Sequence, residues 1–295
     1  MRVTPSIQSR NFLEDLARTK ARMDKAQDEL SSGRRVKVHS DDPYAAGQAS
    51  ELEAVFSENT EFIANNDQLI SKLGFLDSTV QRLVQSLEGA QILAAQALSG
   101  TTTAESRAAL SEGATGTRKQ VLSIANTQYN GTFLFSGSRR PAGDAFTDNA
   151  PGFAYDGNDD AVYHRLDRST TVQTNITGQD LFGDPPAVLD VLDDLKTAID
   201  NNDPAAIRAQ AANLETIANR VNALGAIVGE RIQLAEQTQS RLREYNLALQ
   251  KETSRLVDAN LVESISEFNL ADQAVKVSLS SQARIEQLSL LDYLR

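Results

Sequence analysis

Apolar residues recur in alternating steps of four and three along most of this 295-residue chain, and this spacing predicts long amphipathic helices. The clearest stretch runs from residue 44 to about residue 99 without a convincing helix stop. Its regular apolar positions are Leu69, Leu73, Leu76, Val80, Leu83, Leu87, Ala90, Ala94 and Ala97. At 1.5 Å per residue, such a helix would extend roughly 80 Å. A helical pattern of this length is typical of a rod or coiled coil.

Both ends of the chain show the same spacing. Near the N-terminus the apolar seam is Phe12, Leu16, Thr19, Met23, Ala26 and Leu30. Near the C-terminus it is Leu261, Ile265, Phe268, Ala271, Val275, Ser278, Gln282 and Ile285. An isolated helix of this kind is marginal in water, so each terminal arm needs a helical partner. The most economical arrangement pairs the two arms with each other.

The middle of the chain changes period from helical to two after Asn130-Gly131. Short strands are predicted at 132–135, 153–155, 162–166 and 170–176, and Asp156–Asp160 is interpreted as a hairpin turn between the second and third. Residues 141–203 hold thirteen Asp and no Glu, a composition typical of loops and turns. Helix starts are predicted near Thr102, where Thr-x-x-Glu resembles a capping box, and near Asp184-Pro185 and Asp203-Pro204.

These patterns predict a mainly α protein, an elongated multi-helix rod or coiled coil formed by the N- and C-terminal segments, with a small β-rich inserted domain. We expect three parts. Residues 1–42 with 256–295 form a terminal helical domain, 43–131 with 185–255 a helical rod, and 132–184 a β-rich outer domain.

The stretch from Leu30 to Ala49 separates the N-terminal arm from the long helix. Ser31, Ser32 and Gly33 are expected to end the first helix, and Ser40-Asp41-Asp42-Pro43 supplies N-cap side chains before a proline suited to a first helical turn. Between them, Arg34 to Val38 alternates basic and apolar residues. On these signals alone, the stretch is either a plain connector or a functional joint.

Composition and charge narrow the possible functions. The net charge is −11, yet residues 1–40 carry +4, so the remaining residues carry −15. This acidic bulk argues against nucleic acid as a partner. No apolar run is long enough to span a membrane, so no membrane partner is expected, and the start lacks the apolar segment of an ordinary secretory signal. The absence of cysteine argues against disulfides and thiol chemistry.

No arrangement of residues suggests catalysis, a metal or a cofactor. His39 and His164, the only histidines, stand outside any paired-histidine motif. Asp156, Asn158 and Asp160 resemble the start of a calcium loop, but its sixth position is Ala161 instead of glycine. We therefore interpret this segment as an acidic turn and do not expect an enzyme.

These residues resemble the flagellin superfamily of bacterial flagellar axial proteins. The matching segments are Leu30-Ser31-Ser32-Gly33-Arg34-Arg35, then Ser40-Asp41-Asp42-Pro43, and later Ile124–Thr127 with Tyr129-Asn130-Gly131 and Phe133–Gly137. The resemblance covers both helical arms, and its motifs are specific in combination.

Two branches of the superfamily are candidates. Filament subunits usually carry an arginine-containing run late in the long helix, where this chain has Leu87-Glu88-Gly89-Ala90-Gln91-Ile92-Leu93. The terminal run Leu288–Leu294 and the strand Phe133–Gly137 look more like the hook-associated protein 3 family of hook–filament junction proteins. The resemblance therefore favours a junction protein, with flagellin as the alternative. A secreted coiled-coil adhesin would explain the heptads but not the motifs.

The resemblance implies a structural role outside the cell. Such proteins leave unfolded through the flagellum-specific type III export channel, with an export chaperone, and assemble as a ring of their own copies. Hook-associated protein 1 would lie on the hook side and flagellin on the filament side. We expect Leu16, Met23 and Leu30 to form the assembly interface with Ile265, Phe268 and Val275.

The same resemblance makes the stretch after Leu30 a hinge motif, comprising Ser31, Gly33, Arg34, Arg35, Lys37, Ser40, Asp41, Asp42 and Pro43. Arg34, Arg35 and Lys37 are expected to face acidic surfaces of neighbouring subunits, because the rest of the chain carries the negative charge.

Overall fold

The computed structural model describes residues 5–99, 103–149 and 153–293. Its helices are α1 (Pro5–Ser32), α2 (Pro43–Ala97), α3 (Ala104–Ala125), α4 (Val188–Asp200), α5 (Pro204–Val257) and α6 (Leu261–Tyr293), with a π-helical turn, η1 (Gln179–Gly183). The mainly α class with a small β-rich region is confirmed. Contacts divide the chain into two compact units, residues 59–244 and residues 1–58 with 245–295. The expected three-part division stays a prediction.

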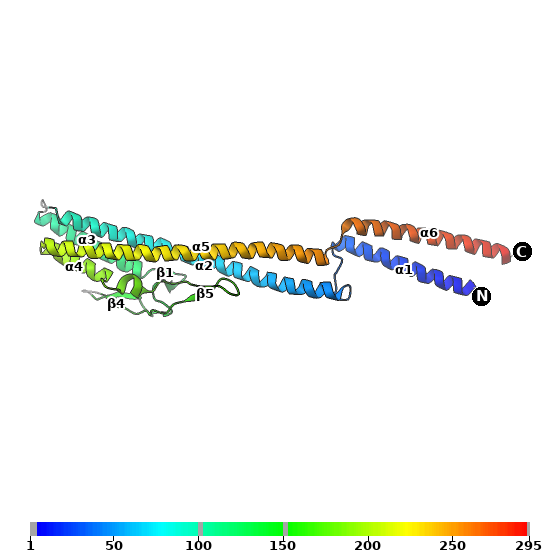
Figure 1. Cartoon of the computed structure of the whole chain (residues 1–295), viewed down its shortest axis with the longest axis horizontal. Helices are drawn as coiled ribbons and strands as arrows, with labels where there is room; N and C mark the ends of the chain where they lie inside the picture. The colour runs from blue at the N-terminus through cyan, green and yellow to red at the C-terminus, as the bar shows by residue number, and fades with distance from the viewer. Residues whose placement is uncertain (1–4, 100–102, 150–152, 294–295) are drawn as a thin grey trace. The chain divides into compact units, whose positions relative to one another are not determined.

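The unit of residues 59–244 is built on the predicted seam of α2. All nine apolar positions from Leu69 to Ala97 are buried. They share one hydrophobic core with residues of α3, α4 and α5, which lie alongside in Figure 1. The α5 contribution is Leu214, Ile217, Val221, Val228 and Ala235. The four–three spacing therefore identified the core-facing side of α2.

Helix starts follow capping chemistry, with two departures from expectation. Asp203 Oδ1 accepts hydrogen bonds from the backbone N–H groups of Ala205 and Ala206, as expected at the start of α5. The N-cap of α3 is Thr103, whose side chain accepts from Ser106 N; the expected cap, Thr102, lies outside the described residues. The helix expected near Pro185 begins at Val188.

The strands form three separate antiparallel pairs. β1 (Gln128–Tyr129) pairs with β2 (Thr132–Phe133), β3 (Phe146–Asp148) with β4 (Phe153–Tyr155), and β5 (Tyr163–Arg165) with β6 (Thr171–Gln173). The interpretation of Asp156–Asp160 as a hairpin turn is wrong, because β4 and β5 pair with other strands. Of the expected strand 132–135, Leu134 and Phe135 are core residues outside the ladder.

Aromatic side chains hold this β-rich region to the helices. The rings of Phe135 and Phe146 each contact Phe182 of η1 edge-on, with centroids 5.4 and 5.2 Å apart. All three are fully buried in the same core as the helix leucines. The buried Arg118 of α3 adds ion pairs to the half-exposed Asp148 and to Asp193, at 2.9 and 2.7 Å. Burial lowers the pKa of Arg118, but the hydrogen bonds that it donates to the Asp148 and Asp193 carboxylates outweigh burial and raise that pKa.

The other unit contains α1, α6, the first turns of α2 and the last turns of α5. α1 and α6 lie side by side and run in opposite directions (Figure 1). A small apolar cluster of Val36, Ala45, Ala46, Ala49 and Val257 joins the start of α2 to the end of α5. This unit carries the residues expected to assemble.

Candidate assembly site

The pairing of α1 with α6 follows the expected seam of α1. Phe12, Leu16, Thr19, Met23 and Leu30 are partly buried and Ala26 is buried. On α6, Ser264 and Ala271 are buried, and Phe268, Val275, Ser278 and Gln282 are partly buried. At the end near residue 30, Ser264 Oγ donates to Glu29 Oε2 at 2.7 Å.

One expected interface residue lies away from this seam. Ile265 is 51% exposed, and its neighbour Ser264 occupies the position against α1. Leu16, Met23, Leu30, Phe268 and Val275 lie along the seam, so five of the six expected residues come together within one subunit. Their role between subunits stays a prediction. Side chains of the terminal run Leu288–Leu294 lie outside the described part of the chain.

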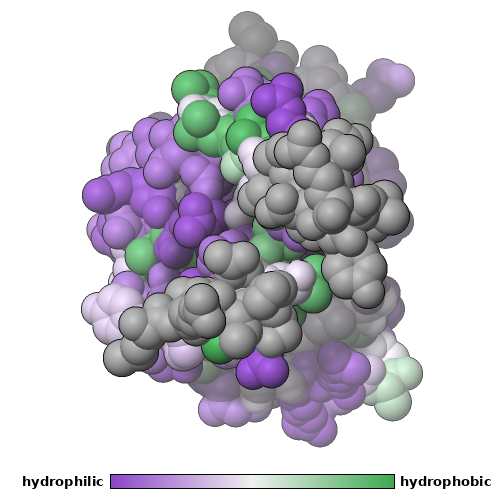
Figure 2. Space-filling model, turned by 90° about the vertical axis from the view of Figure 1, so that its right-hand side faces the viewer, coloured by the Kyte–Doolittle hydropathy of each residue, from purple (hydrophilic) through white to green (hydrophobic). Residues whose placement is uncertain are grey.

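The helix pair leaves large apolar side chains on its surface. Val262, Leu270 and Val277 of α6 are 78%, 61% and 62% exposed. Ile7 and Leu13 of α1, and Leu261 and Leu279 of α6, are at least 46% exposed. Figure 2, viewed from the side of the termini, shows hydrophobic patches within a mostly hydrophilic surface. Apolar surface left this way on a narrow helix pair is typical of a surface that becomes buried in an assembly.

The two segments that connect these helices to α2 and α5 hydrogen-bond to each other; we call Gly33–Asp42 and Asp258–Asn260 together the joint. Gly33 ends α1 in the left-handed conformation, with φ +68°, as expected for a glycine after a helix. Its carbonyl accepts from Ala259 N at 2.9 Å. Arg35 N and Val36 N donate to Val257 O, and Arg34 and Asp258 form an isolated antiparallel β-bridge between the two segments.

Acidic side chains fix the loop before α2. Asp41 Oδ2 accepts from the N–H groups of Lys37 and Val38, and Asp42 Oδ1 caps α2 by accepting from Ala45 N. Backbone hydrogen bonds, led by Val38 at Asp41 and Ala45 at Asp42, lower the pKa of both carboxyl groups. The expected capping by this hinge motif is confirmed for Asp42, and Pro43 is the first residue of α2. Ser31 Oγ donates to Asp28 O, while Ser40 is exposed.

The three basic residues of the joint have different surroundings. Arg35 forms an ion pair with Asp42 at 3.1 Å and donates to Leu256 O at 2.8 Å. Lys37 Nζ lies 3.6 Å from Asp28 Oδ2. Within the described residues, no hydrogen bond or ion pair holds the Arg34 guanidinium. Two of the three cations are thus engaged within the subunit, and Arg34 is the one with its charge available.

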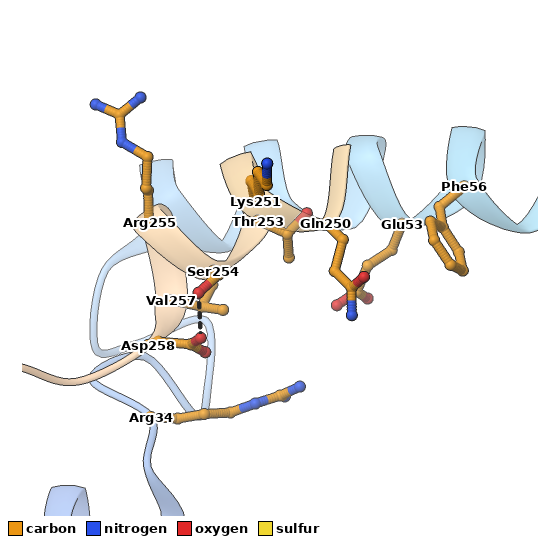
Figure 3. A pocket seen from close by; sticks show the side chains of 10 residues that line it. All are labelled: Arg34, Glu53, Phe56, Gln250, Lys251, Thr253, Ser254, Arg255, Val257 and Asp258. Atoms are coloured by element: carbon orange, nitrogen blue, oxygen red, sulfur yellow. Dashed lines mark hydrogen bonds between the residues drawn. The ribbon is translucent and has the colours of Figure 1, made fainter. Parts of the chain in front are cut away.

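Arg34 lines an open groove between the start of α2 and the end of α5, with a volume of about 800 Å³ (Figure 3). Phe56 and Val257 supply its apolar wall, and Glu53 and Lys251 its charged edges. Ser254 Oγ donates to Asp258, and Arg34 is drawn below this pair in Figure 3.

The described residues include no group of three or more His, Asp or Glu able to hold a metal ion. His39 is exposed on the joint, and Asp156 of the calcium-like segment pairs with Arg139 at 2.7 Å. Among the described helices, none combines the length and apolar character needed to cross a membrane.

The amino-acid sequence is similar to those of known flagellar proteins. Residues 4–140 match the bacterial flagellin N-terminal helical region. The chain is 25% identical to flagellar hook-associated protein 3 of Salmonella typhimurium strain LT2 and 24% identical to that of Escherichia coli K12, each over 98% of both chains.

Solved structures share the fold. FlgL of Bacillus cereus is 22% identical, with a TM-score of 0.58 over 69% of this chain and 97% of its own. The flagellar junction protein FlgL of Legionella pneumophila is 14% identical, with a TM-score of 0.62 over 72% of this chain and 100% of its own.

The long paired helices and the match of residues 4–140 make this chain similar to one class of protein, the axial proteins of the flagellin superfamily. Within that class, the resemblance predicted from the motifs, to flagellar hook-associated protein 3, is confirmed over nearly the whole chain. The protein is a structural component of the bacterial flagellum.

Proposed function

We propose that this protein forms the junction between the hook and the filament of the flagellum. It acts by association of its own copies into a ring, with hook-associated protein 1 on the hook side and flagellin on the filament side. The observation that carries the proposal is the exposed apolar surface of the α1–α6 pair. The relatives named hook-associated protein 3, and the neighbour titled a junction protein, support this particular position in the flagellum.

Coupled folding and assembly is the proposed mechanism. Only Ala26, Ser264 and Ala271 are buried among the described residues of α1 and α6, so the pair has little core of its own. Neighbouring subunits would cover the exposed aliphatic side chains and order the arms. The chain would be secreted through the flagellar type III channel with an export chaperone, and its task involves no catalysis.

A deletion strain tests the position in the flagellum. Without this protein, cells should keep their hooks and release unassembled flagellin into the medium, and the full chain should restore filaments. Hooks that still carry filaments in the deletion strain would contradict the junction role.

A truncation tests the arms. A chain lacking residues 1–40 and 256–295 should be unable to restore filaments in that strain, because it lacks the surface proposed to contact neighbours. Retention of residues 59–244 as a folded unit can be checked by circular dichroism. Assembly of the truncated chain between hook and filament would contradict the mechanism.

Charge reversal at Arg34 and at Arg35 distinguishes a contact between subunits from a contact within one subunit. Arg34→Glu should weaken assembly without lowering the unfolding temperature, because its guanidinium has no described partner to lose. Arg35→Glu should lower stability of the joint, since it replaces the ion pair with Asp42 by repulsion. If Arg34→Glu assembles like the unaltered chain, the joint serves only as a connector.

Flagellin remains the second candidate, because the family match in residues 4–140 is to the flagellin N-terminal region. Electron microscopy of the purified full chain distinguishes the two. Long filaments of this protein alone would favour a filament subunit, and chains that do not polymerise would favour the junction.

A further inference from the structure

Two small adjoining cavities lie between α2 and the β-rich region, within the unit of residues 59–244. The first, about 350 Å³, is lined by Asn65, Gln68, Leu69, Lys72, His164 and neighbours from β1 and β5. The second, about 290 Å³, is lined by Lys72, Arg140, Asn175 and residues 129, 130 and 132–134, among others. Lys72, Tyr129, Asn130 and Val162 line both. The two spaces therefore share one wall centred on a lysine.

His164 faces this wall because of the strand register. It lies opposite Val172 in the β5–β6 pair, and Val172 is buried, whereas the flanking Tyr163 and Arg165 are exposed. Asn66 of α2 donates to Leu166 O at 3.0 Å and holds the end of β5 against α2. The Nε2 atom of His164 is buried and has no hydrogen-bond partner among the described residues. A buried imidazole nitrogen without a partner is costly.

Lys72 is partly buried, and among the described residues no carboxylate pairs with it. Neither cavity is lined by Asp or Glu, although the chain contains forty of them. Burial lowers the pKa of Lys72, and burial together with the Lys72 charge lowers the pKa of His164. Lys72 is thus a cation without a paired carboxylate, beside an imidazole whose protonated form is disfavoured.

The remaining walls are held in place by hydrogen bonds. Asn175 Oδ1 accepts from Val162 N at 2.9 Å, and Val162 O accepts from Thr174 N at 2.7 Å. Tyr129 and Tyr163 are the other titratable groups at the histidine side, and Arg140 lies at the far side. Such a wall is rigid, positively charged and partly aromatic.

From this arrangement we propose that the cavities at Lys72 and His164 bind a carboxylate group. The ammonium of Lys72 would neutralise one negative charge, and the imidazole Nε2–H would donate the hydrogen bond it lacks. A single ammonium and an imidazole match a monovalent group, and Leu69 with the tyrosine rings suits its organic part. The carboxylate comes either from a small molecule or from an Asp or Glu side chain of a second copy.

Nuclear magnetic resonance of the two histidines provides the test. The full chain is labelled at histidine, His39→Gln assigns the His164 signals, and sodium acetate is titrated against sodium chloride at constant ionic strength. Acetate should shift the His164 signals in a saturable way and raise the pKa of this imidazole by about 1–3 units, because an opposite charge favours its protonated form. The His39 signals should not respond.

Matched variants test whether Lys72 is responsible for the acetate response, and a dilution series tests whether a second copy supplies the carboxylate. Lys72→Met should remove the acetate response and, without acetate, raise the pKa of His164, while Lys119→Met, which removes an exposed lysine of α3, should leave both unchanged. If His164 shifts with protein concentration in the absence of acetate, the carboxylate belongs to a second copy. No response to acetate or to dilution, or an acetate response that persists in Lys72→Met, would overturn the proposal.

Discussion

Replacement of two exposed residues of α6, Leu270→Ser with Val277→Ser, isolates the proposed assembly surface. The two positions are one heptad apart and are 61% and 62% exposed. Full burial of a large aliphatic side chain contributes roughly 1.5–3 kcal/mol, so covering the exposed part of each would contribute about 1–2 kcal/mol. The double variant should therefore lose about 2–4 kcal/mol of association free energy per subunit. This loss corresponds to roughly a 30- to 1,000-fold weaker association.

The assay is complementation of the deletion strain, with flagellin measured in the medium and on the cells. The double variant should leave most flagellin in the medium, whereas Leu270→Met with Val277→Ile, which keeps the apolar surface, should restore filaments. Thermal unfolding of the purified double variant should match the unaltered chain, since neither side chain is in the core. Normal filaments with the double serine variant would refute the assignment of this face to subunit contacts.

Three further predictions concern the unit of residues 59–244. Arg118→Ala should destabilise it by about 3 kcal/mol in denaturant unfolding, because two carboxylates lose a buried partner, while Lys119→Ala should change it little. Gly137→Ala should also destabilise it by about 3 kcal/mol, since φ is +67° and the new Cβ would lie 2.1 Å from Asn158 O; unfolding near neutral pH measures this. Burial would raise the pKa of Asp167, but hydrogen bonds from Ser169 and Thr170 lower it to about 2, below the ordinary value of 3.8. Ionised Asp167 therefore contributes about 2 kcal/mol to the free energy of unfolding above pH 3.8, and this contribution should be lost as the pH falls toward 2. In acid unfolding, Asp167→Asn should not show this pH-dependent loss.

The long helices could be predicted because their signal is local and repeated. From Leu69 to Ala97, nine successive seam positions agree on one face, and a helix that buries that face satisfies all of them at once. Caps were equally accessible where a single side chain decides the start, as Asp203 and Asp42 do.

The seam of α6 shows where a hydrophobic pattern misleads. The predicted seam positions from Phe268 through Gln282 agree with the structure. Toward the N-terminus, the next predicted position is Ile265, because isoleucine is apolar. The strict alternation leads to Ser264 instead, which is buried with its hydroxyl bonded to Glu29. A small polar residue at a seam position gives no hydrophobic signal, although the spacing alone could have identified it.

Contacts between residues far apart in the chain could not be predicted from the sequence. The strand at 153–155 was predicted, yet its partner Phe146–Asp148 had no strand signal of comparable strength. In the same way, Lys37 and Arg35 read as free cations because their spacing does not reveal Asp28 or the carbonyl of Leu256 beside them. The cavity at Lys72 and His164 unites residues 92 positions apart, so only the fold brings them together.

The two compact units differ in what stabilises them. Residues 59–244 bury leucines and three phenylalanine rings in one core, whereas the described part of the α1–α6 pair buries Ala26, Ser264 and Ala271. Burial of such small side chains yields little hydrophobic free energy, while ordering each helical residue costs about 1–2 kcal/mol of backbone entropy before helix hydrogen bonds offset it. Additional burial would have to come from surfaces that the pair leaves exposed. Among the α6 side chains that the structure describes, Val262, Leu270 and Val277 are the most exposed large apolar ones. Under the proposed function, neighbouring subunits would supply this burial.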